Sequence, residues 1–314
     1  MRKFLQPINW KPAVLWGLLL VVLYSPAVRA EENPADRAYL RDVYKNMAGI
    51  SSVHYDVAIK GDSTMGDVQL GASGDLRDKP LKFSQELSLV YHDLLGKETQ
   101  FKVQQCGEAD QENLVVYMLH DGQWVKQTVP VGPVLGKVPS EAEKAATLEE
   151  MLQLIKSVKT IQETPAYKSL EITLDTMKLS DTIAATVQLQ AQKTEDSLQA
   201  DQIKQASALI RMALLAAGDI KYTVKVDKAS KLVKETEMDL TDPIHKGAGL
   251  FLNMAPAKDR EEISDFIKKA TLTLKVNYSK YNQAVSIEIP QEARDTAQEV
   301  TAQEKVTLTK PADQ

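Results

Sequence analysis

Cysteine is almost absent from this chain of 314 residues, and the single one, Cys106, cannot form an internal disulfide. The fold must therefore be held by its core. A cysteine nucleophile would need a histidine and an acid beside it, and the neighbouring sequence QQCGEAD matches no known signature. Aromatic residues make up only 6% of the chain, which disfavours a stacking or sugar-binding surface.

An excess of positive charge is also missing. The chain has 38 Lys and Arg against 43 Asp and Glu, a formal net charge of −5. A nucleic-acid partner is therefore excluded, because contacts to phosphates supply most of that affinity. The same charge argues against electrostatic docking on an anionic membrane, so we expect membrane contact to be transient at most.

The N-terminus carries a targeting signal. A basic start is followed by an apolar run from Ala13 to Tyr24, which is too short to span a bilayer comfortably. The sequence SPAVRA then predicts cleavage after Ala30; a retained signal anchor is the alternative. Cleavage removes four positive charges and no acid, which takes the net charge from −5 to −9. We therefore expect an exported protein, periplasmic or extracellular, and no cysteine near the cleavage point offers a lipid anchor.

Motifs of catalysis are missing as well. The four histidines show no ligand spacing and are read as surface or strand-edge residues: His54, His92, His120 and His245. No HExxH, GxSxG or phosphate loop occurs, and GASG (71–74) is predicted to be a sharp connection between strands. The acidic neighbours Glu149/Glu150 and Glu261/Glu262 diverge around a helix. We therefore predict no catalytic residue, no metal ligand and no cofactor.

Alternating apolar residues predict an antiparallel sheet with one exposed face. The expected strands and hairpins lie at 52–60, 83–91, 112–129 with an Asp121-Gly122 turn, 170–174, 219–240 and 271–290. In the last of these, Val285, Ile287 and Ile289 alternate with polar residues until Pro290, which predicts a closing strand with an inner face.

Helical periodicity predicts several helices. The first is capped by Asn33 and ends at Gly49. A second helical section is predicted from capping-box pairs and an apolar face, at Ser140/Glu143, Thr147/Glu150, Met151, Leu154, Ile155 and Val158. The longest helix spans 197–217, and its wide apolar sector predicts burial on more than one side or a cover over a cavity. One or two short helices are expected within 242–270.

Together these patterns resemble the LolA/LppX-like superfamily of exported lipid and lipoprotein carriers, over roughly residues 34–293. The resemblance rests on the first helix with SSVHYDVAIK, and on YMLHDGQWVK, YTVKVDKASKLVKETEMDL and YNQAVSIEIPQEA. It implies an α+β fold in which a strongly curved antiparallel half-barrel carries helices on its concave side, with an apolar cavity between them. Members with known roles hold acyl chains there. No catalytic motif belongs to the family, and this chain lacks the lipobox cysteine of many relatives.

The resulting interpretation has three parts along the chain: a signal peptide (1–30), one half-barrel domain (31–293) and a polar, disordered tail (294–314). The stretch GAGLFLNMAP (247–256) is either a glycine-hinged lid or a short buried helix. The residues expected to bind the ligand are Tyr117, Leu119, Tyr222, Val224, Leu250, Phe251 and Met254.

The sequence therefore favours a non-enzymatic binding protein whose partner is a lipid or an acylated protein. The alternative is an envelope structural or protein-interaction module whose half-barrel is filled by side chains. An exported hydrolase ranks third, because no nucleophile and base can be assembled.

Overall fold

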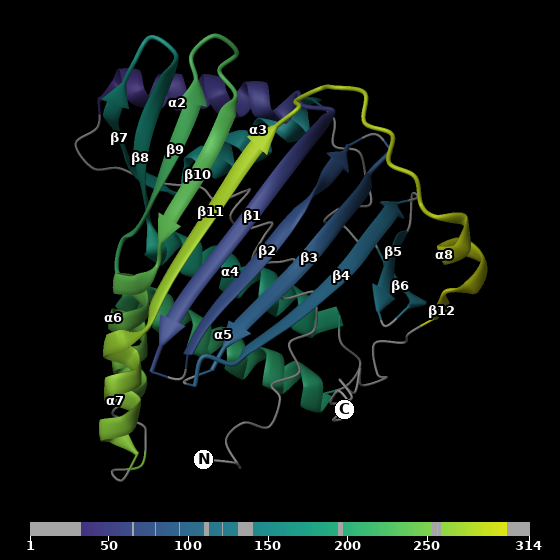
Figure 1. Cartoon of the computed structure of the whole chain (residues 1–314). Coiled ribbons are helices and arrows are strands. Elements are labelled where there is room, and N and C mark those ends of the chain that lie inside the picture. Colours follow the sequence, from purple (N-terminus) through teal and green to yellow (C-terminus); the bar gives the residue numbers. More distant parts are fainter. Residues whose placement is uncertain are drawn as a thin grey trace.

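Twelve strands form one curved sheet in the computed structural model, which describes residues 33–299 apart from 65, 79, 94, 110–112, 121, 131–140, 194–196, 253–255 and 257–258. Their order is β12-β6-β5-β4-β3-β2-β1-β11-β10-β9-β8-β7 (Figure 1). Neighbouring strands are antiparallel, except that the two-residue β12 runs parallel to β6. The predicted α+β class and the curved antiparallel sheet are confirmed.

The strands are β1 (Ser52–Ser63), β2 (Gly66–Arg77), β3 (Lys82–His92), β4 (Glu98–Ala109), β5 (Asn113–His120), β6 (Gln123–Pro130), β7 (Ile155–Glu163), β8 (Tyr167–Leu174), β9 (Ile220–Asp227), β10 (Val233–Asp239), β11 (Thr271–Ser279) and β12 (Gln298–Glu299). The helices are α2 (Pro34–Ala48), α3 (Glu141–Leu152), α4 (Thr176–Lys193), α5 (Ser197–Ala217), α6 (Thr241–Leu252), α7 (Arg260–Lys269) and α8 (Gln291–Thr296). The predicted hairpins β5–β6 and β9–β10 are confirmed, as are two helices within 242–270.

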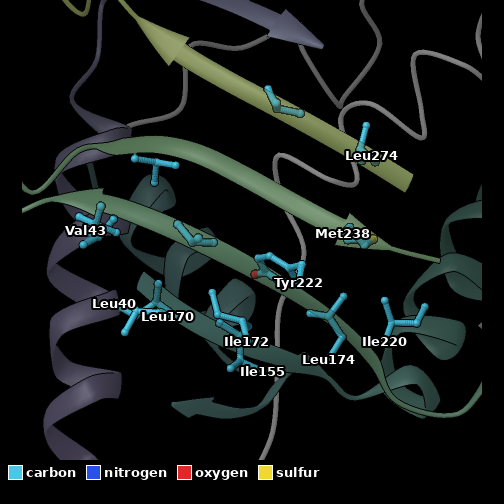
Figure 2. Close-up of a cluster of buried hydrophobic side chains, with 14 of the residues drawn as sticks. Leu40, Val43, Ile155, Leu170, Ile172, Leu174, Ile220, Tyr222, Met238 and Leu274 are labelled. Atoms are coloured by element: carbon cyan, nitrogen blue, oxygen red, sulfur yellow. The ribbon is translucent and has the colours of Figure 1, made fainter. Parts of the chain in front are cut away.

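Strand register defines two faces of the sheet, because directly opposed residues point to the same side. One continuous row runs across seven strands: Tyr222, Met238, Leu274, Ile59, Leu70, Leu89 and Phe101. We call the side that carries this row the inner face. The main core lies on it, over β7–β11 and β1, and includes buried residues of α2, α3 and α4 such as Leu40, Leu152 and Leu179 (Figure 2).

Helix α2 forms as its sequence predicts. The Asn33 side-chain oxygen accepts a hydrogen bond from the Ala35 backbone N–H at 3.1 Å, Pro34 occupies the first turn, and Gly49 caps the end. Its apolar stripe buries Leu40 and Val43 completely against the sheet.

The same helix protects an edge of the sheet. Strand β7 pairs only with β8, so its outer edge would leave backbone groups open. The carboxylate of Asp36 accepts hydrogen bonds from the backbone N–H of Thr160 at 3.0 Å, from its hydroxyl at 2.6 Å and from Lys168 Nζ at 2.7 Å. The guanidinium of Arg37 donates to the carbonyl of Leu152 at 2.7 Å. This buried carboxylate thus takes the place of a neighbouring strand.

The section around residue 150 differs from its prediction. Helix α3 is one helix, so Thr147 lies inside it and does not cap it, while Ser140 lies outside the described residues. Ile155 and Val158 belong to strand β7, where the β-branched side chains pack on the core from an extended backbone. Helix α4 was not anticipated, because its apolar residues are separated by many glutamines and threonines.

The predicted connection at GASG is also wrong, because residues 71–74 lie in the middle of β2. Two of its glycines allow close approach of β3. A Cβ at Gly71 would lie 2.6 Å from the Ser88 hydroxyl, and one at Gly74 would lie 2.4 Å from the Ser84 carbonyl oxygen. Glycine within a strand here indicates tight packing between strands and not a turn.

The closing strand is not formed. After β11, Lys280 and Asn282 adopt positive φ angles of 51° and 54°, and residues 283–290 are extended without belonging to a strand (Figure 1). Ile289 is buried, but against the face opposite to the inner one. The chain then forms α8 and β12 at the far edge of the sheet, so residues 294–299 are not part of a disordered tail.

Replacing Asp36 by Asn should lower the free energy of unfolding at pH 7 by about 1–3 kcal/mol, because charge-assisted hydrogen bonds are lost. Burial raises the pKa of Asp36, but the bonds from Lys168 and Thr160 outweigh it and hold the pKa below its ordinary value. The stabilisation is therefore complete at neutral pH and is lost as the pH falls through the folded-state pKa, below about pH 4. Urea unfolding should show a lower free energy of unfolding for the variant at neutral pH. At acid pH, the free energies of the wild type and the variant should converge.

The matched control is Asp42→Asn. Asp42 lies on the same helix as Asp36, and its replacement removes an exposed ion pair with Lys231. Exposed pairs contribute little, so its unfolding midpoint should stay unchanged. Equal losses in the two variants would contradict the role assigned to Asp36.

Candidate ligand-binding face

The inner face of β1–β4 carries no charged side chain among the described residues of these strands. The positions that register assigns to it are Val53, Tyr55, Val57, Ile59, Gly61, Ser63, Gly66, Val68, Leu70, Ala72, Gly74, Leu76, Phe83, Gln85, Leu87, Leu89, Tyr91, Thr99, Phe101, Val103, Gln105, Gly107 and Ala109. The opposite, outer face carries the acids, lysines and histidines of the same strands. This face can therefore offer apolar contacts and a few neutral hydrogen bonds.

One half of this face, towards the β2–β3 turn, is closed. Three buried polar residues form a chain in which the Tyr55 hydroxyl donates to Gln85 Oε1 at 2.5 Å, and Gln85 Nε2 donates to Gln105 Oε1 at 2.6 Å. Burial raises the pKa of Tyr55, with a smaller contribution from Asp75, so the phenol stays neutral. The buried ring of Phe83 lies over Gly107, whose Cβ would be only 2.4 Å from it.

The other half, towards the β3–β4 turn, is partly open. Leu70 and Leu89 are only partly buried, while Tyr91 is 37% and Phe101 39% exposed. We call Val68, Leu70, Leu89, Tyr91, Phe101 and Val103 the open patch. These residues were not selected as site residues from the sequence, although the alternation in FSQELSLVY does place Leu89 and Tyr91 on one side of a strand.

Helix α5 has a partly exposed side chain on its sheet-facing side. Ile210 lies one turn before Leu214, which packs against the main core, so both point towards the inner face. Ile210 nevertheless remains 45% exposed. The helices α4 and α5 run behind the central strands, on the side away from α8 (Figure 1). Apolar surface is thus left uncovered on both the helix and the sheet.

The residues predicted to bind a ligand do not come together. Tyr222 and Val224 lie on the inner face but inside the filled core, in which Figure 2 shows Tyr222. The Tyr222 and Tyr44 hydroxyls are hydrogen-bonded there at 2.9 Å. Tyr117 pairs with Cys106, and its side chain and that of Leu119 lie on the outer face. Six strands separate the two pairs. Their use as one site would require a ligand on both faces of the sheet.

The other predicted site residues come from the proposed lid. Leu250 and Phe251 belong to α6, but their side chains lie outside the described part of the chain, as does the whole of Met254. Gly247 is inside this helix and faces α5, where a Cβ would lie 3.0 Å from the carbonyl oxygen of Ala213. This glycine therefore permits a close helix–helix contact, which agrees with the short-helix alternative.

A second, smaller core occupies the outer face. Its buried members are Cys106, Tyr117, Trp124, Ile289 and Ala293, with Val115, Leu119 and Ala297 beside them. The segment 283–290 and α8 cover it, and Arg294 Nη1 fixes α8 to Glu108 Oε1 at 2.5 Å. Burial raises the pKa of the Cys106 thiol to about 11, so it is not a nucleophile at neutral pH.

Titratable groups on the outer face pair with one another. His54 Nδ1 lies 2.8 Å from Asp75, and His92 bridges Asp67 at 2.9 Å and Glu98 at 3.2 Å, which raises the pKa of His92. No three metal-binding side chains converge within the described residues. Two surface depressions, of about 630 and 340 Å³, are lined mainly by polar side chains.

None of the described helices is long and apolar enough to cross a membrane. The fold and this face define an α+β protein with an open half-barrel whose inner face, over the described residues of β1–β4, is apolar and uncharged. A family model matches residues 41–298, and the chain belongs to that family, the family of unknown function DUF6612. No curated protein sequence matches the chain.

Several solved structures are similar over most of their length. The lipoprotein LppX of Mycobacterium tuberculosis is 14% identical, with a TM-score of 0.39, covering 82% of this chain and 100% of LppX. LprF of Mycobacterium bovis is 13% identical, with a TM-score of 0.39, covering 82% and 98%. A DUF1329 family protein of Desulfovibrio piger is 6% identical, with a TM-score of 0.22, covering 81% and 94%. Likenesses at these TM-scores carry no argument about ligand or activity.

The thiol of Cys106 should react with a disulfide reagent at neutral pH at least about a hundredfold more slowly than a free thiol, because little thiolate forms and the sulfur is covered. Ile289→Asp should accelerate the reaction by loosening the cover of the outer core. Absorbance of the released thiolate measures both rates. Ile161→Asp, at the opposite edge of the sheet, is the control. A wild-type rate near that of a free thiol would contradict this account.

Proposed function

We propose that this protein binds an apolar ligand, a lipid or the acyl chain of a lipoprotein, on the inner face of its sheet, without catalysis. The observation that carries the proposal is the open patch. It is apolar, it lies on the part of the inner face, over β1–β4, where the described residues carry no charged side chain, and it remains partly exposed. An acyl chain would remove this surface from water, which stabilises the complex by about 25 cal/mol per Å² buried.

The closed half of the face can offer a ligand only neutral polar contacts. Tyr55, Gln85 and Gln105 satisfy one another, and no charge is available there to bind a carboxylate or phosphate. We infer that a ligand places its apolar tail on the open patch and leaves any charged head group outside, near the β3–β4 turn.

We further infer that the chain is exported after cleavage at Ala30, and that residues 31–293 act as one unit. A structural or protein-interaction module with a filled core is the alternative. The partly exposed Tyr91 and Phe101 favour the carrier, because a filled half-barrel would bury them.

Phe101→Asp should weaken binding of a fluorescent fatty acid by about tenfold or more, because a charge enters the apolar contact. The chain beginning at Glu31 is titrated with the probe, and native mass spectrometry reports any lipid carried from the host. Thermal unfolding should change little, since Phe101 is partly exposed.

The matched control is Ile161→Asp, which places the same charge at an exposed apolar position on the opposite edge strand, β7. It should bind the probe as the wild type does. A wild type that carries no lipid and rejects the probe would exclude the carrier function, and equal weakening in the two variants would exclude the open patch as its site.

A further inference from the structure

The outward side of α5 is apolar. Leu209, Met212 and Leu215 are 43–44% exposed, and the only charged residue between 206 and 217 is Arg211. The sequence predicts that the wide apolar sector of this helix is either buried on more than one side or covers a cavity, and the exposure of these three residues is not compatible with the first alternative. Helical spacing separates them from Leu214, which faces the core.

A neighbouring helix extends this surface. Arg211 Nη2 pairs with Asp181 Oδ1 at 2.7 Å, and because Asp181 precedes the end of α4 by about as many residues as Arg211 follows the start of α5, the helices are antiparallel. Met177, one turn before Asp181, therefore lies beside Leu215, one turn after Arg211. Met177 is 63% exposed. We call Met177, Leu209, Met212 and Leu215 the α4–α5 patch.

We propose that the α4–α5 patch docks on the neutral, zwitterionic surface of a lipid bilayer, where the protein would take up or deliver its ligand. The inference rests on the proposed carrier function. The patch shares helix α5 with a side chain of the sheet-facing side, because Leu209 points outward whereas the adjacent Ile210 lies one turn before Leu214, which packs against the main core. A lipid that moves from the bilayer to the ligand face would have to pass only helix α5.

The size of the patch argues against a stable protein interface. The exposed area of its four side chains together is about that of two fully exposed side chains, on the order of a few hundred Å². A stable dimer needs about 800 Å² from each partner. Shallow insertion of a few apolar side chains into a bilayer suits a small convex surface and gives weak, reversible binding.

Charge favours a neutral membrane. The ion pair Arg211–Asp181 neutralises itself at the border of the patch, and no other charged residue belongs to it. The chain without residues 1–30 carries a net charge of −9, so anionic lipids would repel it. Binding should therefore be driven by apolar contact and should not weaken at high salt.

The test is flotation of the chain beginning at Glu31 with phosphatidylcholine vesicles at low and high salt. The wild type should float at both salt concentrations. Met212→Gln/Leu215→Gln adds no charge and should lower the partition constant by about tenfold or more, because two apolar contacts are replaced by amides. The matched control is Ile161→Gln on the edge strand β7, another exposed apolar position, which should float as the wild type does.

Three results would overturn the inference: a wild type that does not float, a double variant that floats equally well, or a wild-type dimer in light scattering that the double variant dissociates. The last would make the patch an interface between two copies. Probe binding without vesicles separates the two proposals. A protein that binds the fatty-acid probe but not vesicles loses only the docking step, whereas one that binds vesicles but no probe loses the carrier function.

Discussion

The rest of the structure depends on the separation of charge across the sheet. Because neighbouring residues of a strand point to opposite sides, the charged residues of β1–β4 fall on one face and the apolar residues on the other. Helices must then cover the apolar face. They do so completely over β7–β11, where the core is filled, but leave the β3–β4 end partly exposed. The candidate site is therefore the part of this face that the helices do not reach.

The sequence predicted which segments form strands and helices better than it predicted which segments lie side by side. The period of two identified most strands, and the predicted turn correctly joined β5 to β6, where His120 pairs with Gln123 and Gly122 has a φ of 73°. The same period misplaced 283–290, because alternation shows that one side of a segment is buried but not that a strand lies beside it. The buried side of this segment includes Ile289, which covers the outer core although the segment does not pair with a strand.

The same reasoning explains why the predicted ligand residues are divided. Tyr222 alternates with polar neighbours, whereas Tyr117 lies in the apolar run LVVYML. Nothing in either strand alone tells which face of a shared sheet each tyrosine will occupy. That information lies in the register through all the intervening strands, which depends on contacts such as that between Gly74 and β3. The glycines that suggested a turn in fact help to hold this register.

Helix α5 has two apolar surfaces because the pair of helices α4 and α5 is narrower than the sheet that it covers. Leu214 reaches the core, while Ile210, one turn before it, stays partly exposed and Leu209 faces outward. A helix selected only for packing would carry charged residues on its outward side, since these cost little stability and improve solubility. That α5 instead keeps leucine and methionine there, in an acidic protein with abundant surface charge, indicates that exposed apolar surface on this helix has a use beyond folding.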